Sequence, residues 1–385
     1  MSLVFADQKT ELRILFVIGS LELGGAESQM LMLVRELTHQ KIDCEVFAVQ
    51  ASGALRGAFD ELGIPVHCGR YDYTSRKLAK GFQLIRAAWL LWLHARRATV
   101  LQAYLPLTNF MGACAGYLAG VDKIITCRRG LGNHQDRHSG WKLFDRIANS
   151  LSDVVVVNSQ MVAEDTVRRD GIRRDKLICI YNGIDTGRIQ RVLPQREVVR
   201  QSLGLALGQV TLIIVANLIP YKGHAELIDA LSRLLPRFPD LQLLVVGQDR
   251  GIMAQLTSQA ATLGVGAAIQ WLGLRRDVPE LLSAADIYVC ASHEEGFSNS
   301  LLEALAAGKP AVATSVGGNA EMLENGALGV LVNPHAPDEL AAAISDLIAD
   351  PARRAHMGHR ARLEVERRYS VGHMAAQYIR LYENK

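Results

Sequence analysis

The sequence has few cysteines, and no two of them stand in a C-x-x-C spacing. Six cysteines in 385 residues are too sparse for a disulfide scaffold. We therefore expect reduced thiols in a cytoplasmic protein. The six are Cys44, Cys68, Cys114, Cys127, Cys179 and Cys290.

The chain also lacks a dominant charge and a long hydrophobic run. Its 42 basic and 39 acidic residues leave a formal net charge of +3, which argues against a nucleic-acid-binding protein. The longest apolar run, Ala87–Leu93, is far shorter than the roughly 20 residues of a membrane span. Residues 1–19 carry acidic residues ahead of their apolar stretch and no basic n-region, so we expect no signal peptide.

Short apolar runs alternate with helical patterns along the whole chain. In the first half, strands are predicted at 13–18, 44–49 and 153–157, with a helix at 26–39. A polar stretch at 186–208 precedes a second alternation, with strands predicted at the five ranges 211–216, 241–247, 269–272, 286–290 and 311–314. The pattern predicts an α/β protein of two doubly wound domains, residues 1–195 and 196–366.

Two glycine-containing segments follow predicted strands, where open parallel sheets bind ligands. Gly24 and Gly25 open the first helix, at a place where backbone amides favour an anion. Lys222 lies at the start of another helix, where its charge opposes the macrodipole unless an anion shares it. Taken alone, the Gly24–Gly25 segment is better explained as an ordinary βα turn, and Lys222 fits an exposed surface lysine about equally well. A further loop, 273–276, could face a base or a ribose.

The stretch from His293 to Leu323 is the most informative. Ser298 and Asn299 are good N-cap residues for the helix that follows, and the amides of Ser298–Ser300 would form an anion site. Glu303 falls in the second turn of that helix, among apolar neighbours. A carboxylate there is tolerable if it accepts hydrogen bonds from hydroxyl groups, such as those of a ribose.

These segments resemble retaining glycosyltransferases of family GT4, which have the GT-B fold. Glu295 and Glu303 hold the spacing of the E-x7-E signature, "GGAE" matches the N-terminal glycine loop, and "YNGIDT" resembles the Asn-Gly-x-Asp of the domain junction. The resemblance implies two Rossmann-like domains facing across a cleft. It also implies a C-terminal helix, residues 367–385, that crosses back to the first domain.

The resemblance further implies a nucleotide-diphospho-sugar donor, expected to be a UDP-sugar, and a glycan or lipid-linked acceptor. Glu303 would bind the ribose, Glu295 would lie near the sugar, and Lys222 would neutralise the diphosphate. Leu274 would hold the base through its backbone. The residues expected to bind the donor are Gly24, Gly25, Asn217, Lys222, Gly273, Leu274, Glu295, Gly296, Phe297, Ser298, Asn299, Ser300 and Glu303.

The sequence departs from the family pattern at two places. Asn217 stands where many members have an arginine, which leaves more of the leaving-group charge to Lys222. The first-domain histidine of many members is missing from "IITCRRGLGN", where Cys127, Arg128 or Arg129 could replace it. The residues expected to act in catalysis are therefore Glu295, Lys222, Arg128 and Arg129.

The implied reaction is a hexosyl or glycosyl transfer with retention, in polysaccharide or glycoconjugate biosynthesis. The departing diphosphate oxygen would help deprotonate the acceptor, so cationic and amide stabilisation matter most. No Asp-x-Asp motif is present, and we expect neither a catalytic metal nor a cofactor. A metal site at His134, Asp136 and His138 is disfavoured, because their surroundings are those of a loop.

Residues 75–97 combine a strongly apolar helix with basic flanks. We expect a helix buried in the first domain. The alternative is peripheral contact with an anionic membrane at its inner face.

Three other functions fit parts of the pattern. A GT-B-fold nucleotide-sugar epimerase would act without an acceptor. A two-domain ligand-binding protein would carry an export signal, which is not seen. A dinucleotide dehydrogenase is disfavoured, because no G-x-G-x-x-G opens the first helix.

Overall fold

The computed structural model describes residues 12–50, 53–137 and 140–384. The chain forms two compact units, each of which is described by itself. The first unit takes in the described residues of 1–157, 163–180 and 374–385, and the second takes in 158–162 and 181–373.

The first unit is built on a seven-stranded parallel sheet in the order β3-β2-β1-β4-β5-β6-β7. The three strands predicted in this half are confirmed to within one residue at each end. The strands are β1 (Arg13–Ile18), β2 (Asp43–Ala48), β3 (Val66–Cys68), β4 (Val100–Tyr104), β5 (Lys123–Arg128), β6 (Val154–Val157) and β7 (Leu177–Cys179).

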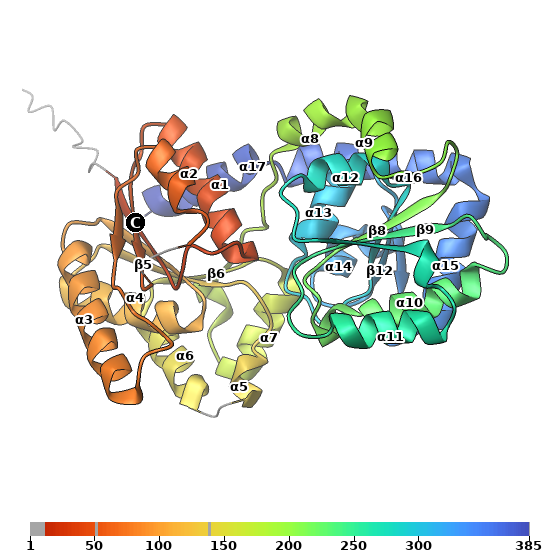
Figure 1. The fold of residues 1–385 in the computed structure, drawn as a ribbon. Helices are drawn as coiled ribbons and strands as arrows, with labels where there is room; N and C mark the ends of the chain where they lie inside the picture. Colours follow the sequence, from red (N-terminus) through yellow and green to blue (C-terminus); the bar gives the residue numbers. More distant parts are fainter. Residues whose placement is uncertain (1–11, 51–52, 138–139, 385) are drawn as a thin grey trace, which may run out of the picture. The chain divides into compact units, whose positions relative to one another are not determined.

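Helices cover both faces of this sheet (Figure 1). Side chains alternate along each strand, so Leu15 and Val17 pack with α3 and α4, while Phe16 stacks on Tyr104 on the opposite face. The helical elements are α1 (Gly25–His39), α2 (Arg56–Glu61), α3 (Lys77–Ala95), α4 (Pro106–Ala119), α5 (His134–Arg137), α6 (Gly140–Leu151), α7 (Gln160–Asp170), η1 (Arg174–Lys176) and, from the chain end, α17 (Val371–Glu383).

The second unit is built on a six-stranded parallel sheet in the order β10-β9-β8-β11-β12-β13. All five strands predicted here are confirmed, with ends that differ by one residue at most. The strands are β8 (Thr211–Val215), β9 (Gln242–Val246), β10 (Ile269–Gly273), β11 (Ile287–Cys290), β12 (Ala311–Thr314) and β13 (Val330–Val332).

Each face of the second sheet has its own apolar core. Leu212 and Ile214 pack with α10, α11 and α15, whereas Ile213 packs with α12, α13 and α16. The helical elements are α8 (Thr186–Val192), η2 (Leu193–Gln195), α9 (Arg196–Ser202), η3 (Pro220–Lys222), α10 (His224–Leu234), α11 (Met253–Thr262), η4 (Gly266–Ala268), α12 (Val278–Ala284), α13 (Asn299–Ala306), α14 (Asn319–Met322), η5 (Glu324–Gly326), α15 (Pro337–Ala349) and α16 (Pro351–Arg368).

The boundary between the units differs from the one predicted at 195. The second unit resumes at Tyr181 because α8 and α9 pack on it. Arg196 donates to the carbonyl oxygens of Ser283 (2.7 Å) and Ala285 (2.8 Å), and Arg200 donates to that of Ala284 (2.9 Å). Two arginines of the polar stretch thus bind backbone oxygens of the second unit, which a flexible linker would not do.

The C-terminal helix α17 belongs largely to the first unit, from Met374 onward. Its Tyr382 hydroxyl donates to Gln102 Oε1 (2.6 Å), and the Lys123 ammonium donates to the Leu381 carbonyl oxygen (2.7 Å). These two hydrogen bonds join α17 to β4 and β5.

Helix α3 departs from the expectation of a buried helix. Only Ala87, Leu91 and Ala95 are buried along its 19 residues. Among the residues that the structure describes, no helix has the length and hydropathy needed to cross a bilayer.

Candidate functional site

Two of the predicted donor residues of the second unit follow the strands at which its strand order reverses. Strands β8 and β11 are neighbours in the sheet, and each is followed by a loop that carries a charged residue. Lys222 follows β8, and Glu295 follows β11. In open parallel sheets this reversal is where ligands bind, beyond the carboxyl ends of the strands.

Lys222 and Glu295 form an ion pair, with 2.6 Å between Nζ and Oε1. The Ser292 hydroxyl donates to the same carboxylate oxygen (2.8 Å). Burial alone lowers the pKa of Lys222, but the adjacent Glu295 carboxylate outweighs it and holds that pKa above its usual range. The lysine is therefore charged, and Glu295 is the anion that makes a cation tolerable beside the start of α10.

Two glycines allow the loops around this pair to pack closely. Gly223 has φ +71°, and a Cβ there would lie 1.9 Å from the Ala291 carbonyl oxygen. Gly317 has φ +51°, and its Cβ would lie 1.8 Å from the Glu295 carbonyl oxygen. Any larger residue at either position would push the β11 loop away, so the position of Glu295 depends on both glycines.

Ser298 caps α13, as the sequence predicts. Its hydroxyl accepts from the Leu301 amide (3.4 Å). The neighbouring side chains are fixed too, because the Tyr288 hydroxyl donates to Ser300 Oγ (2.8 Å) and Asn182 Nδ2 donates to Asn299 Oδ1 (2.7 Å). The N-terminus of this eight-residue helix, whose dipole favours an anion, is thus held in the same unit as Lys222.

Glu303 lies one turn further along α13, among the buried residues Leu302 and Ala304. Burial raises the pKa of the Glu303 carboxyl to about 7, and the positive charge of Arg188 opposes that rise. The carboxyl group has no ion-pair partner among the described residues at salt-bridge distance, so its ionised form is costly without a hydrogen-bonding ligand.

The remaining donor residues surround this core in different roles. Gly273 has φ +64° at the end of β10, and the Leu274 side chain after it is exposed. Asn217 Oδ1 accepts from the Gln248 amide (3.1 Å) and so ties two strand-end loops together.

Gly296 and Phe297 support the fold around Glu295. The Gly296 carbonyl oxygen accepts from the Gly318 amide (2.9 Å). Phe297 is buried, with its ring centroid 5.3 Å from that of Tyr181 and 5.6 Å from that of Tyr369.

In the first unit, Gly24 is the N-cap of α1 and Gly25 its first residue. A Cβ on Gly24 would lie 2.2 Å from Glu27 Oε2, so the Glu27 carboxyl group turns back over the start of its own helix. Burial raises the pKa of that carboxyl. An anion approaching the α1 amides would therefore meet the Glu27 carboxyl group. Glu27 is part of the "GGAE" segment, but the sequence interpretation gave it no role of its own.

The arginines proposed to act in catalysis have partners inside the first unit. Arg128 is buried and pairs with Asp145 Oδ2 (2.9 Å) and Asp170 Oδ2 (2.8 Å). Arg129 donates to the Tyr378 hydroxyl (3.1 Å), and its guanidinium lies 5.1 Å from the centroid of the Tyr104 ring. The Arg128 contacts join the end of β5 to α6 and α7, and the Arg129 contact joins it to α17, so both arginines have structural partners beside the catalytic role proposed for them.

Cys127 is a poor replacement for a histidine. It is fully buried, and burial raises the pKa of its thiol to about 11. The thiol therefore stays protonated at neutral pH.

The segment considered for a metal was expected to be a loop, but its described part forms helix α5. Asp136 pairs with Arg169 (2.8 Å), and His138 lies outside the described residues.

Three residues that hold the site had no role assigned from sequence: Asn182, Arg188 and Ser292. Asn182 belongs to the "YNGIDT" motif, so its position could have drawn attention to it. Arg188 donates to the Arg276 carbonyl oxygen (3.5 Å) and acts on Glu303, which only the packing of α8 against α12 and α13 brings about.

Comparison with known proteins agrees with this arrangement. Residues 195–364 match the family model described as "Glycosyl transferases group 1", and residues 23–188 match that of "Glycosyltransferase Family 4". Alpha-maltose-1-phosphate synthase of Mycolicibacterium smegmatis is 28% identical over 356 residues, covering 83% of this chain and 90% of that protein. D-inositol 3-phosphate glycosyltransferase of Corynebacterium glutamicum is 31% identical over 244 residues, covering 60% of this chain but only 57% of that protein.

Solved structures show the same fold. Anabaena HepE in complex with UDP and glucose superposes with a TM-score of 0.85 at 25% identity, covering 97% of this chain and 100% of that one. Sucrose-phosphate synthase of Thermosynechococcus elongatus gives a TM-score of 0.80 at 18% identity, covering 96% and 98%. With two parallel Rossmann-like sheets and both halves of the chain matched, this protein is a GT-B-fold glycosyltransferase and belongs to family GT4.

Proposed function

We propose that this glycosyltransferase transfers a sugar from a UDP-sugar, with retention of anomeric configuration, to a glycan or lipid-linked acceptor. The observation that carries the proposal is the set of Glu303, the Lys222–Glu295 pair and the α13 N-terminus within one unit. A half-buried carboxyl without an ion-pair partner in the described part of the chain suits a ribose diol, and a half-buried ammonium beside a helix N-terminus suits a diphosphate.

The structures of Anabaena HepE with UDP and with UDP-glucose support a uridine donor, because that protein shares 25% of its sequence and the whole fold with this chain. The Lys222 ammonium has three N–H donors and gives one to Glu295, so it can reach a phosphate oxygen while staying charged. The backbone of Gly273 and Leu274 would hold the base.

In this mechanism the chain's residues mainly stabilise and position the leaving group. Lys222 and the α13 amides would offset the charge that develops on the departing diphosphate, and Glu295 would hold Lys222 in place. The diphosphate oxygen itself would take the acceptor proton, so no nucleophilic side chain is required. We propose that the reaction needs no metal ion and no cofactor.

Helix α3 gives a reason to propose an acceptor at a membrane surface. Four of its large apolar side chains lie at helical spacing on one side and are exposed: Leu78 (92%), Phe82 (72%), Ile85 (71%) and Trp89 (56%). Exposed basic residues flank the stripe, with Arg76 and Lys77 at its start and Arg96 and Arg97 at its end. Such a helix is suited to lie in the interface of an anionic bilayer. We propose that the enzyme is cytoplasmic, contacts the inner face of the membrane through this helix, and acts in polysaccharide or glycoconjugate synthesis.

Thermal unfolding with UDP, GDP, ADP and their glucose conjugates tests the donor. A ligand at a hundredfold over its dissociation constant should add roughly 2.7 kcal/mol of stability, and we expect this for the uridine series only. Stabilisation by GDP or ADP alone would overturn the uridine assignment.

The stereochemistry and the metal requirement are tested on the product. Proton NMR of the product should show the same anomeric configuration as the donor sugar, and transfer should continue when a metal chelator is added. A change in the donor sugar without any acceptor would indicate an epimerase instead.

Co-sedimentation with vesicles containing phosphatidylglycerol tests the membrane surface. Phe82→Glu should abolish binding, whereas Leu207→Glu, at a still more exposed apolar residue of the second unit (93%), should leave binding unchanged. Equal binding to neutral and anionic vesicles would contradict the proposal.

A further inference from the structure

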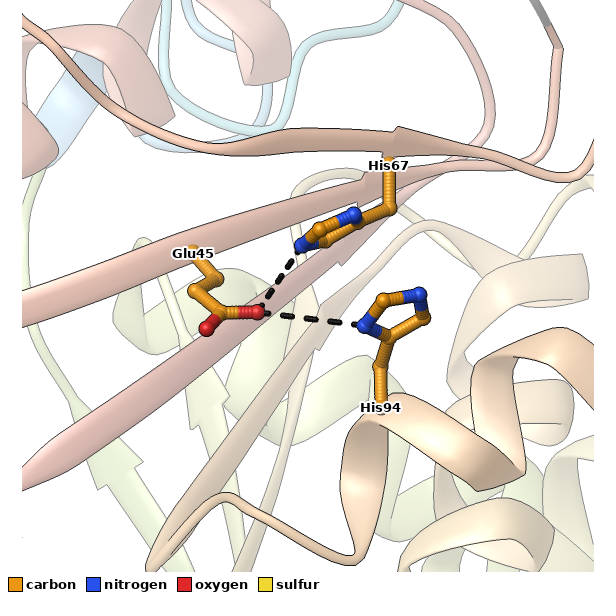
Figure 2. A group of neighbouring side chains, drawn as sticks. All are labelled: Glu45, His67 and His94. Carbon is orange, nitrogen blue, oxygen red and sulfur yellow. Dashed lines mark hydrogen bonds and ion pairs between the residues drawn. The ribbon is translucent and has the colours of Figure 1, made fainter.

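A glutamate and two histidines converge on one another in the first unit. Glu45 comes from β2, His67 from β3 and His94 from the last turn of α3. Figure 2 shows both imidazole rings turned toward the carboxyl group of Glu45. His67 Nε2 lies 2.9 Å and His94 Nδ1 3.9 Å from the same Glu45 Oε2, and the two rings stack with centroids 3.7 Å apart.

The separations match those of a metal's ligands. The three candidate ligand atoms all lie within 4.8 Å of one another. Two ligand atoms bound about 2.05 Å from a tetrahedral ion are about 3.3 Å apart, which falls between the two distances to Glu45. Binding a tetrahedral ion would therefore require the His94 nitrogen to approach the Glu45 oxygen by roughly half an ångström.

The framework that holds the three side chains is regular secondary structure. Phe47 pairs with His67 in the parallel register of β2 and β3, so Glu45, two residues earlier, points to the same face of the sheet. Phe47 also packs against His94, with ring centroids 6.1 Å apart. Ligands fixed on two strands and a helix keep their geometry better than ligands on loops.

We propose that Glu45, His67 and His94 bind a divalent transition-metal ion of the zinc type, which links the β2–β3 edge of the sheet to the end of α3. Two imidazoles and one carboxylate are a ligand set that such ions accept, with a fourth position left for water. All three side chains are partly exposed, at 34%, 29% and 23%, so an ion can reach them from solvent. The site is independent of the proposed donor and of the transfer reaction.

Within the described residues a second such group exists, made of Glu226, His293 and His335 in the second unit. Its His335 is 63% exposed, and both His293 and His335 belong to loops. It is the weaker candidate, and it provides a matched control.

The experiment uses the full-length protein freed of metal and titrated with zinc chloride alone, with calorimetry for affinity and elemental analysis for stoichiometry. We expect His67→Gln and His94→Gln each to weaken zinc binding by at least roughly tenfold, and His335→Gln to leave that affinity unchanged. X-ray absorption of the zinc-loaded protein should show two imidazoles and one carboxylate at about 2.0–2.2 Å. Glu45→Gln gives a third measurement if either histidine variant does not fold, as judged by circular dichroism.

Two results would overturn the proposal. One is that the folded wild-type protein binds no zinc, or that folded His67→Gln and His94→Gln variants bind it as tightly as the wild type. The other is that affinity is lost in His335→Gln and kept in the other two, which would move the ion to the second group.

Discussion

Replacing Glu303 by glutamine separates the stability cost of a buried carboxylate from its proposed role in binding a nucleotide. Burial raises the pKa of Glu303 to about 7 from an ordinary 4.5. The ionised carboxylate therefore lowers the free energy of unfolding by at most about 3 kcal/mol. The folded state holds the proton more tightly, so this cost is absent below pH 4.5, grows up to pH 7 and is complete above it.

Glutamine has the same shape and no charge to lose. Glu303→Gln without ligand should therefore unfold at a higher temperature than the wild type at pH 8, and at the same temperature at pH 4.5. The difference at pH 8 is the cost of the ionised carboxylate, with about 3 kcal/mol as its upper limit because water reaches part of the side chain.

The same variant should bind UDP-glucose more weakly, because hydrogen bonds from the ribose to a charged acceptor contribute about 1.5–3 kcal/mol. Wild-type affinity should also fall roughly tenfold between pH 8 and pH 6, since only about a tenth of a carboxyl with a pKa near 7 is ionised at pH 6. UDP-glucose suits calorimetry here because it lacks the terminal phosphate proton of UDP. Unchanged affinity together with an unchanged pH dependence of stability would refute the reasoning.

Three further substitutions test the rest of the site. Lys222→Met should lower the free energy of urea unfolding by about 2 kcal/mol and abolish transfer, because it leaves Glu295 without its cation. Adding Glu295→Gln should restore the stability but not the activity. A double variant as unstable as the single one would contradict the ion pair. Arg128→Met should cost about 3 kcal/mol or more, because it removes the cation that two buried carboxylates share, with UDP affinity kept; a stable variant that loses turnover would favour the catalytic role instead. Gly317→Ala should lower stability by about 3 kcal/mol and impair transfer, whereas Gly264→Ala, also at positive φ but facing open space, should cost only about 1 kcal/mol; equal losses would mean that strain alone matters.

Much of the fold follows from local patterns. The runs around Val17, Ile214 and Val289 are short and apolar, and each forms a strand. A strand of a parallel sheet that is covered on both faces is apolar along its whole length, so such a run predicts it. Ser298 caps its helix as its position predicts, since a cap bond joins residues only three apart. The likeness of the Glu295–Glu303 spacing to a known signature likewise needs nothing beyond the sequence.

What depended on tertiary structure is which groups meet. Lys222 and Glu295 pair because β8 and β11 are neighbours in the sheet, an order that no local pattern encodes. Arg128 looked available for catalysis until Asp145 and Asp170 were seen to enclose it. The sequence alone thus determined eight of the strands and their ends, because those depend on forces between residues close together in the chain. The packing of distant segments decided which charges are paired and which side chains can meet a ligand.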